Sequence, residues 1–151
     1  MMKASMLLVM CSAAVAAAEP TAQDLKDRAA ELEKQLDGTG MTVLVETPFV
    51  VGGDMGAKET RRIATGFLRS KTALLEKDFF PKRPDKLIEV WLFRNERSFR
   101  AGAKKYFGDA PDTPFGYYSP DHHAMIMNAN GLGTLSHELV HPYMEANIPD
   151  V

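Results

Sequence analysis

The segment "KLIEVWLF", residues 86–93, constrains the fold of this chain most strongly. Glu89 is the only charge in its interior, and the rest of the segment beyond Lys86 is apolar. A short apolar run of this kind is typical of a strand in the interior of a sheet, so we expect this segment to form a central strand. Trp91 is then a core residue. The segment therefore predicts a sheet to which neighbouring parts of the chain contribute.

Helical and strand patterns alternate around this strand. Thr21 followed by Asp24 resembles a capping box, and Asn95 can cap a later helix. Apolar spacing predicts helices over residues 21–36, 57–79, 96–107 and from Thr134 onward, and strands over residues 41–46 and 49–51. The "VGGD" at residues 51–54 predicts a turn. This order predicts an α+β fold built on a mixed sheet.

Two segments allow finer expectations. In the helix over residues 57–79 the inward face is expected to carry Ile63, Phe67 and Leu74, with Leu75 beside them. The stretch "FGYYSPDHHAMIMNA", residues 115–129, predicts a hairpin that turns at Pro120. Its second strand, His123–Asn128, is expected to be an edge strand of the sheet. The side chains of Met125 and Met127 are expected in the core.

The first eighteen residues predict a secretory signal peptide. Lys3 supplies a positive charge, residues 4–15 are uncharged and mostly apolar, and Ala18 follows a run of small residues. We expect cleavage after Ala18, which makes residues 19–151 one domain of a secreted or periplasmic protein without stable membrane insertion. The alternatives are an uncleaved anchor, for which the apolar run is short, and lipid attachment at Cys11, which Met10 disfavours.

Charge and cysteine content exclude several classes of function. The formal net charge of −2 becomes −3 without residues 1–18, which hold one lysine and no acid. No basic footprint remains, so nucleic acid is not expected as a partner. Cys11 is the only cysteine. The mature chain is therefore expected to lack disulfides, a cysteine nucleophile and cysteine-ligated zinc.

The sequence "HELVH", residues 137–141, is the strongest chemical signal. His137 and His141 are four residues apart, which places both imidazoles on one face of a helix, where they can bind one Zn²⁺. Glu138 can lie beside the metal without ligating it and take a proton from the attacking water. The alternative is a helix that carries two histidines on its surface.

The third ligand of such a site is not evident. The metzincin pattern places a histidine at position 147, which is Asn147 here. Glu145 lies about 12 Å from His137 along a helix. Asp150, His122 and His123 are weaker candidates, because Asp150 requires the last residues to fold back and the two histidines precede the helix in the hairpin.

Pro142 follows the second histidine inside the expected helix. It lacks the N–H that would bond to the carbonyl of Glu138, so we expect a kink or a helix end there. Such a break can turn His141 toward the metal or loosen the site. Tyr117, Tyr118 and Tyr143 can each donate a hydrogen bond near the metal or serve as packing aromatics.

The segment "GTLSHELVHPYMEANIPD", with the hairpin before it, resembles the peptidase MA-like zinc metallopeptidases of the gluzincin type. The resemblance covers roughly residues 86–150. It implies a mixed sheet with the active-site helix below an edge strand that pairs with extended substrates. It also implies that His137 and His141 are zinc ligands and that Glu138 is the catalytic base. The family's third ligand is a glutamate on a later helix, and the matching segment would begin beyond Val151.

The chain is therefore interpreted as a partial zincin-like metallopeptidase domain over residues 19–151. The leading hypothesis is a zinc-dependent peptidase, acting on a peptide or protein substrate, that is an incomplete fragment with little activity alone. In such a fragment Leu139, Val140 and Ile148 are expected to be partly exposed. The alternative is a non-catalytic secreted or periplasmic binding protein on the same scaffold. A third possibility is that another chain supplies the third ligand, and the oligomeric state stays open.

Overall fold

The computed structural model describes residues 18–148. The predicted signal segment falls almost wholly on residues 1–17, outside the described residues, as does Asp150. Among residues 18–148, no helix combines the length and apolarity that crossing a bilayer requires. The fold is α+β, as the sequence predicts.

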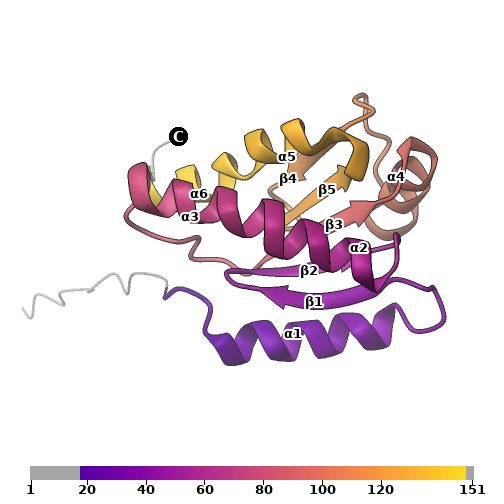
Figure 1. Cartoon of the computed structure of the whole chain (residues 1–151), viewed down its shortest axis with the longest axis horizontal. Coiled ribbons are helices and arrows are strands. Elements are labelled where there is room, and N and C mark those ends of the chain that lie inside the picture. The colour runs from indigo at the N-terminus through magenta and orange to yellow at the C-terminus, as the bar shows by residue number, and fades with distance from the viewer. Residues whose placement is uncertain (1–17, 149–151) are drawn as a thin grey trace, which may run out of the picture.

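The elements follow the expected order along the chain (Figure 1). The strands are β1 (Thr42–Glu46), β2 (Phe49–Gly53), β3 (Ile88–Phe93), β4 (Gly116–Ser119) and β5 (Ala124–Asn128). The helices are α1 (Ala22–Gln35), α2 (Ala57–Arg62), the π-helical η1 (Ile63–Leu68), α3 (Arg69–Asp78), α4 (Glu96–Gly102), the π-helical η2 (Ala103–Phe107), the 3₁₀ turn η3 (Ala129–Gly131), α5 (Leu132–Glu138) and α6 (Val140–Asn147).

The five strands form one mixed sheet in the order β1-β2-β3-β5-β4. The three inner strands β2, β3 and β5 are parallel, and the outer strands β1 and β4 pair antiparallel with their neighbours. Strand β3 lies in the middle, which confirms the expectation for "KLIEVWLF". Trp91 is 4% exposed, so it is a core residue as predicted.

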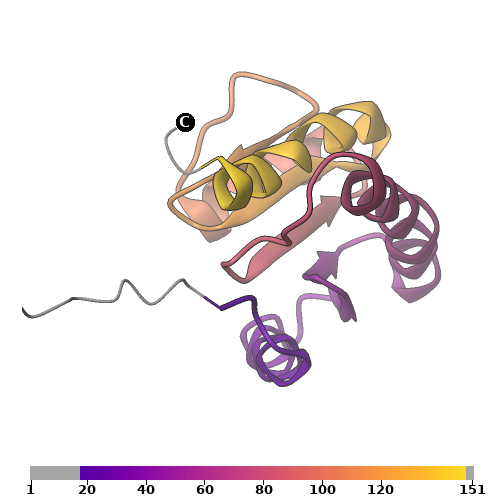
Figure 2. The same cartoon turned by 90° about the vertical axis from the view of Figure 1, so that its left-hand side faces the viewer.

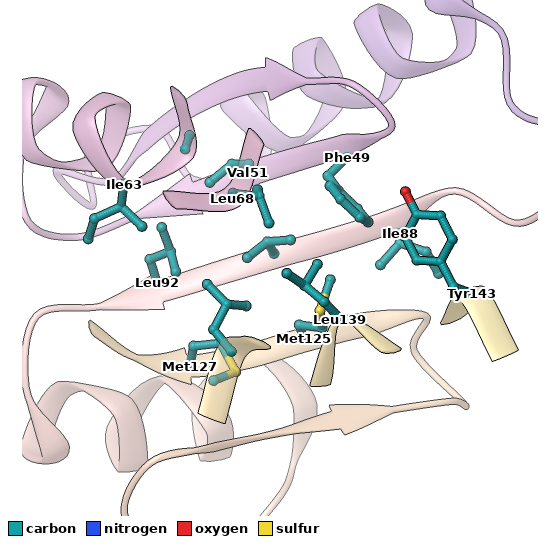
Figure 3. Close-up of a cluster of buried hydrophobic side chains, with 13 residues drawn as sticks. Phe49, Val51, Ile63, Leu68, Ile88, Leu92, Met125, Met127, Leu139 and Tyr143 are labelled. Carbon is teal, nitrogen blue, oxygen red and sulfur yellow. The ribbon is translucent and has the colours of Figure 1, made fainter. Parts of the chain in front are cut away.

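Two apolar clusters cover the two faces of the sheet. On one face, η1, α5 and α6 pack over alternate residues of β2, β3 and β5 (Figure 3). On the other face, α1, α4 and η2 pack over the remaining residues of the same strands. Figure 2 shows α1 separated by the sheet from the helices at the C-terminal end. Met125 and Met127 are fully buried in the first cluster, which confirms their expected core role.

The predicted helix starts are confirmed at two positions. The Thr21 hydroxyl accepts a hydrogen bond from the Asp24 backbone N–H, and the Asp24 carboxylate accepts from the Thr21 backbone N–H. Asn95 and Ser98 make the same reciprocal arrangement at α4. Each pair satisfies N–H groups that the first turn of a helix leaves without an intrahelical partner.

The inward face of the long second helix differs from the expectation. Leu74 is 46% exposed, whereas Thr72 is buried. The π-helical segment η1 explains the difference, because its i→i+5 hydrogen bonds widen the turn and shift the phase of every residue after it. The spacing from Ile63 that assumed 3.6 residues per turn therefore assigned Leu74 to the wrong face.

The prediction that His123–Asn128 forms an edge strand is wrong. Strand β5 lies between β3 and β4, and all five of its residues are buried. The edge strand of the hairpin is β4, which comes first in sequence. Pairing with the central strand requires a segment that is apolar on both faces, and Ala124–Asn128 is more apolar than the tyrosine-bearing β4.

The expected turn at residues 51–54 is wrong in part, because β2 continues to Gly53 and pairs with Leu92. Gly53 is required there by close packing. A Cβ atom at this position would overlap the Oγ1 atom of buried Thr60 on α2. Gly53 therefore allows α2 to pack closely against β2 and does not form a turn.

Burial at the end of the chain also differs from the expectation in part. Leu139 is fully buried in the first cluster, although it was expected to be partly exposed. It points toward the sheet together with Tyr143 (Figure 3). Val140 is half-buried, and Ile148 is 43% exposed, as expected. The inward face of α5 and the residue that follows it are thus fully covered by the sheet.

Two glycine substitutions test this packing. Gly53→Ala is expected to lower the free energy of unfolding by about 2 kcal/mol, because the added methyl group overpacks Thr60. Gly66→Ala is the matched control, since it adds the same methyl group to η1 with no atom within 4 Å. It is expected to raise stability by up to about 1 kcal/mol. Urea denaturation measures both, and equal effects of the two variants would contradict the packing argument.

Candidate metal centre

The "HELVH" motif spans the junction of two short helices. Helix α5 ends at Glu138, Leu139 forms a turn, and α6 begins at Val140. The break lies one turn before Pro142, whose missing N–H leaves the Glu138 carbonyl without its usual partner. The expected kink or helix end therefore takes the form of a one-residue interruption at Leu139, after which the helix resumes and runs to Asn147. Leu135 and Leu139 on the inner side are fully buried, which directs His137 and His141 away from the core.

The break does not separate the two histidines. Their ring centroids lie 5.3 Å apart, with the ring planes at 83°. His137, Glu138 and His141 each offer one ligand atom, and these three atoms lie within 4.8 Å of one another. The structure therefore brings together all three residues that the motif predicts, in a group that could hold a metal ion.

Glu138 is the most fixed member of this group. Its side chain is 12% exposed, compared with 46% for His141. Its Oε2 atom accepts a hydrogen bond of 3.1 Å from the backbone N–H of Tyr118 on β4. The same oxygen lies 3.5 Å from Nε2 of His141. The carboxylate is thus attached to the edge of the sheet.

The register of the hairpin explains why the Tyr118 amide is available. The Asn128 N–H donates to the Phe115 carbonyl, and Tyr118 pairs with Met125. Hydrogen-bonded pairs alternate along an antiparallel ladder, so the main-chain groups of Gly116 and Tyr118 point away from β5. The Tyr118 N–H is therefore directed at the free edge, where Glu138 meets it.

The Tyr118 side chain also contacts the group. Its ring stacks on His141 with centroids 5.9 Å apart and planes at 8°. Its hydroxyl donates to the Glu145 carboxylate at 3.2 Å, and Lys86 Nζ lies 3.8 Å from the same oxygen. Glu145, considered above as a third ligand, is thus held by Tyr118 and Lys86. It is not a member of the metal group, the name used here for His137, Glu138 and His141.

The other candidate ligands lie elsewhere in the described residues. His122 bonds to Ser119 and packs edge-on against Phe107, in a pocket that also contains Trp91 on the opposite side of the sheet. His123 is half-buried, and its Nδ1 atom has no hydrogen-bond partner among the described residues. Asn147, at the metzincin position, bonds to the backbone of Lys82.

Only Tyr118 of the three tyrosines considered above contacts the metal group. The Tyr117 hydroxyl donates to Asp109, and the buried Tyr143 donates to Glu76 at 2.8 Å. The sequence did not indicate the Tyr118 contacts or the role of Lys86. The alternation of β4 could have assigned Tyr118 to one face, but no sequence signal predicts its main-chain bond to Glu138.

This arrangement has a defined chemical capacity. Two exposed imidazoles can rotate toward a shared ion, and a fixed carboxylate lies beside them. Imidazole and carboxylate are ligands for zinc and for several other divalent metals, so the geometry alone does not select one ion.

No family model matches the sequence, and comparison with curated proteins and with solved structures found no match. The candidate site therefore rests on its own geometry.

The three hydrogen-bonded tyrosines predict loss of stability at high pH. Burial is the main cause that raises the pKa of Tyr117, Tyr118 and Tyr143, and the bonded carboxylates Asp109, Glu145 and Glu76 add to it. The folded state therefore binds these protons more tightly than the unfolded chain, whose tyrosine pKa is about 10. This stabilisation is complete below about pH 10 and is lost as the pH rises above it.

Urea denaturation at about pH 8 and about pH 11 is expected to show a lower midpoint at the higher pH. Tyr143→Phe should reduce that difference, because it removes one titrating phenol while its ring remains in the core. If the difference between the two urea midpoints is the same in Tyr143→Phe as in the wild-type protein, Tyr143 does not cause the loss of stability at high pH.

Proposed function

We propose that this chain is a zinc-dependent peptidase domain of the gluzincin type. In this proposal His137 and His141 hold the metal, and Glu138 is the general base. The observation that carries it is the convergence of these three side chains beside the free edge of β4. A mixed sheet with the motif helix at its edge strand supports the family resemblance.

The residues present fit zinc. Two nitrogens on one tetrahedral zinc lie about 3.4 Å apart, because each Zn–N bond is about 2.1 Å long. The ligand atoms of the group already lie within 4.8 Å, so small rotations of the exposed rings suffice. When bound, zinc supplies a Lewis acid that lowers the pKa of water and polarises the substrate carbonyl.

Glu138 is placed to move the proton. A carboxylate has two oxygens, so the oxygen that Tyr118 holds orients the group while the other can accept a proton from the attacking water. In hydrolysis of a peptide bond this proton then passes to the leaving amine nitrogen, which completes the cleavage of the C–N bond. Tyr118 stacking keeps the His141 ring from turning freely.

The described residues supply two imidazoles and one carboxylate to the group. Catalytic zinc sites have three protein ligands. Because Glu138 serves as the base in this proposal, the described residues provide two ligands, and we expect them to bind zinc more weakly and to support lower turnover than a site with three protein ligands. The signal-peptide pattern supports a secreted or periplasmic location for this activity.

A non-catalytic binding protein on the same scaffold is the second candidate. It is favoured by the absence of a further ligand from the group among residues 18–148. In that case the histidines serve no metal, and zinc does not change the stability of the protein. The two candidates therefore differ first in metal binding and only then in activity.

Zinc titration by calorimetry, together with thermal unfolding, tests the metal site. We expect one zinc per chain and a rise in the melting temperature, since the metal binds the folded state. His137→Ala and His141→Ala should each abolish both effects. His122→Ala is the matched control, because this exposed histidine lies across the sheet from the group, and it should bind zinc normally. Equal zinc binding in all variants would show that His137 and His141 do not bind the metal.

Hydrolysis of a casein or peptide library tests the role of Glu138. Glu138→Gln should retain zinc binding and lower chelator-sensitive turnover by about 10²–10⁴-fold, the usual contribution of general base catalysis. Zinc binding without any turnover in the wild-type protein would favour the non-catalytic candidate. Turnover that Glu138→Gln leaves unchanged would exclude the mechanism.

A further inference from the structure

A cavity of about 240 Å³ lies on the face of the sheet opposite the metal group. It is bounded by side chains of α1, β3 and η2, namely Arg28, Gln35, Glu89, Trp91, Tyr106 and Phe107. His122, in the turn between β4 and β5, also lines it. None of these residues belongs to the metal group. The proposed peptidase chemistry therefore does not account for this cavity.

Glu89 is the unusual residue of the cavity. It is the only charge within the central strand β3, and its side chain is only 12% exposed. Its carboxylate accepts a hydrogen bond of 2.8 Å from the Trp91 indole N–H and one of 2.6 Å from Arg28 Nε. Apolar side chains of similar volume often stabilise a buried position as well as an ion pair does, so folding alone does not require a charge here.

The formal charges of the cavity cancel. Arg28 is the only cation and Glu89 the only anion among the described residues that line it, with His122 neutral. Their contact of 2.6 Å leaves neither charge unopposed. An anionic ligand would be repelled by Glu89 and a cationic ligand by Arg28. The charge balance therefore favours a neutral ligand.

The lining nevertheless offers many polar groups. Arg28 has five N–H donors, and its bonds to three side chains leave two of them without a partner among the described residues. Gln35 accepts one of those bonds at 3.5 Å through its oxygen and keeps its own N–H donors. The Tyr106 hydroxyl can donate and accept. An apolar ligand would bury these groups without partners, whereas ligand hydroxyls can satisfy donors and acceptors alike.

Aromatic rings form the apolar part of the wall. The ring centroids of Tyr106 and Phe107 lie 5.0 and 5.1 Å from that of Trp91. The π-helical η2 presents both of these residues, and short π-helical segments are frequent at functional sites. Aromatic faces carry partial negative charge and pack against C–H groups. Because a cavity of roughly 150 Å³ admits benzene, this one has room for a six-membered ring with substituents.

We propose that this cavity binds a neutral monosaccharide. The aromatic wall accounts for the C–H face of a sugar ring, and the mixture of donors and acceptors accounts for its hydroxyl groups. The balanced pair of Arg28 and Glu89 accounts for the lack of net charge on the ligand. The inference goes beyond the proposed function and does not depend on it, because the two sites lie on opposite faces of the sheet.

Intrinsic fluorescence tests the proposal directly, because Trp91 is the only tryptophan of the chain. The protein is titrated in EDTA with glucose, galactose, mannose and N-acetylglucosamine. We expect at least one sugar to change the fluorescence saturably, with a Kd below about 10 mM for a ligand of this size. The absence of a saturable change with all four sugars, up to about 50 mM, would overturn the proposal.

Six-membered rings of other chemistry serve as controls for the ligand class. Cyclohexanecarboxylate is an anion, cyclohexylamine a cation, and cyclohexanol a neutral ring with a single hydroxyl. Each is expected to bind at least about tenfold more weakly than the best sugar, since a site that hydrogen-bonds to hydroxyls rejects analogues that lack them. If any of the three binds as tightly as the best sugar, the cavity does not select a neutral sugar.

Two variants locate the bound sugar. Gln35→Ala removes an exposed amide, and Tyr106→Phe removes a hydroxyl while its ring stays in the wall. Each is expected to weaken binding about three- to tenfold, the usual effect of one hydrogen bond. Gln23→Ala is the matched control, because this exposed glutamine of the same helix bonds to Asp27 instead. Unchanged affinity in both cavity variants, or an equal loss in Gln23→Ala, would overturn the assignment to this cavity.

The sugar titration and the zinc titration are independent measurements. Failure of sugar binding leaves the zinc stoichiometry and the effect of His137→Ala as they are. Failure of zinc binding leaves the sugar titration in EDTA unaffected.

Discussion

The burial of β3 between two apolar clusters is the constraint on which the rest of the structure depends. Ile88, Val90 and Leu92 face one cluster, while Trp91 and Phe93 face the other. A strand that is apolar on both faces must have neighbours on both edges and helices on both sides. Burial of the side chains of β3 and its neighbours, at about 25 cal/mol per Å² of apolar surface, favours this arrangement over any that exposes them.

The position of the candidate metal centre is a consequence of this packing. The α5 helix contacts β4 and β5. Leu135 and Leu139 fill the first cluster, and Tyr143 does the same from α6. With its apolar side fixed in the core, the motif helix can only direct His137 and His141 outward. The helix is interrupted only at Leu139, before Pro142, and the two imidazoles remain in contact.

Tyr118 connects three parts of the molecule that are distant in sequence. Its amide holds Glu138, its ring stacks on His141, and its hydroxyl reaches Glu145 beside Lys86. The amide contact is possible because β4 is an edge strand of the described sheet, so its alternate main-chain groups have no strand partner there. Tyr118 also lines a pocket together with Asp109 and Asp112.

The sequence by itself determined the local features of this protein. Helix caps at Thr21 and Asn95, the central strand, the hairpin and the spacing of His137, Glu138 and His141 all follow from interactions within a few residues. Only the tertiary structure decided which hairpin strand lies at the edge and which way the helix after η1 faces. It also decided that Glu138 is bound by Tyr118 and that Leu139 is buried. Strand order, helix phase and burial depend on contacts between segments far apart in the chain, and no local pattern encodes them.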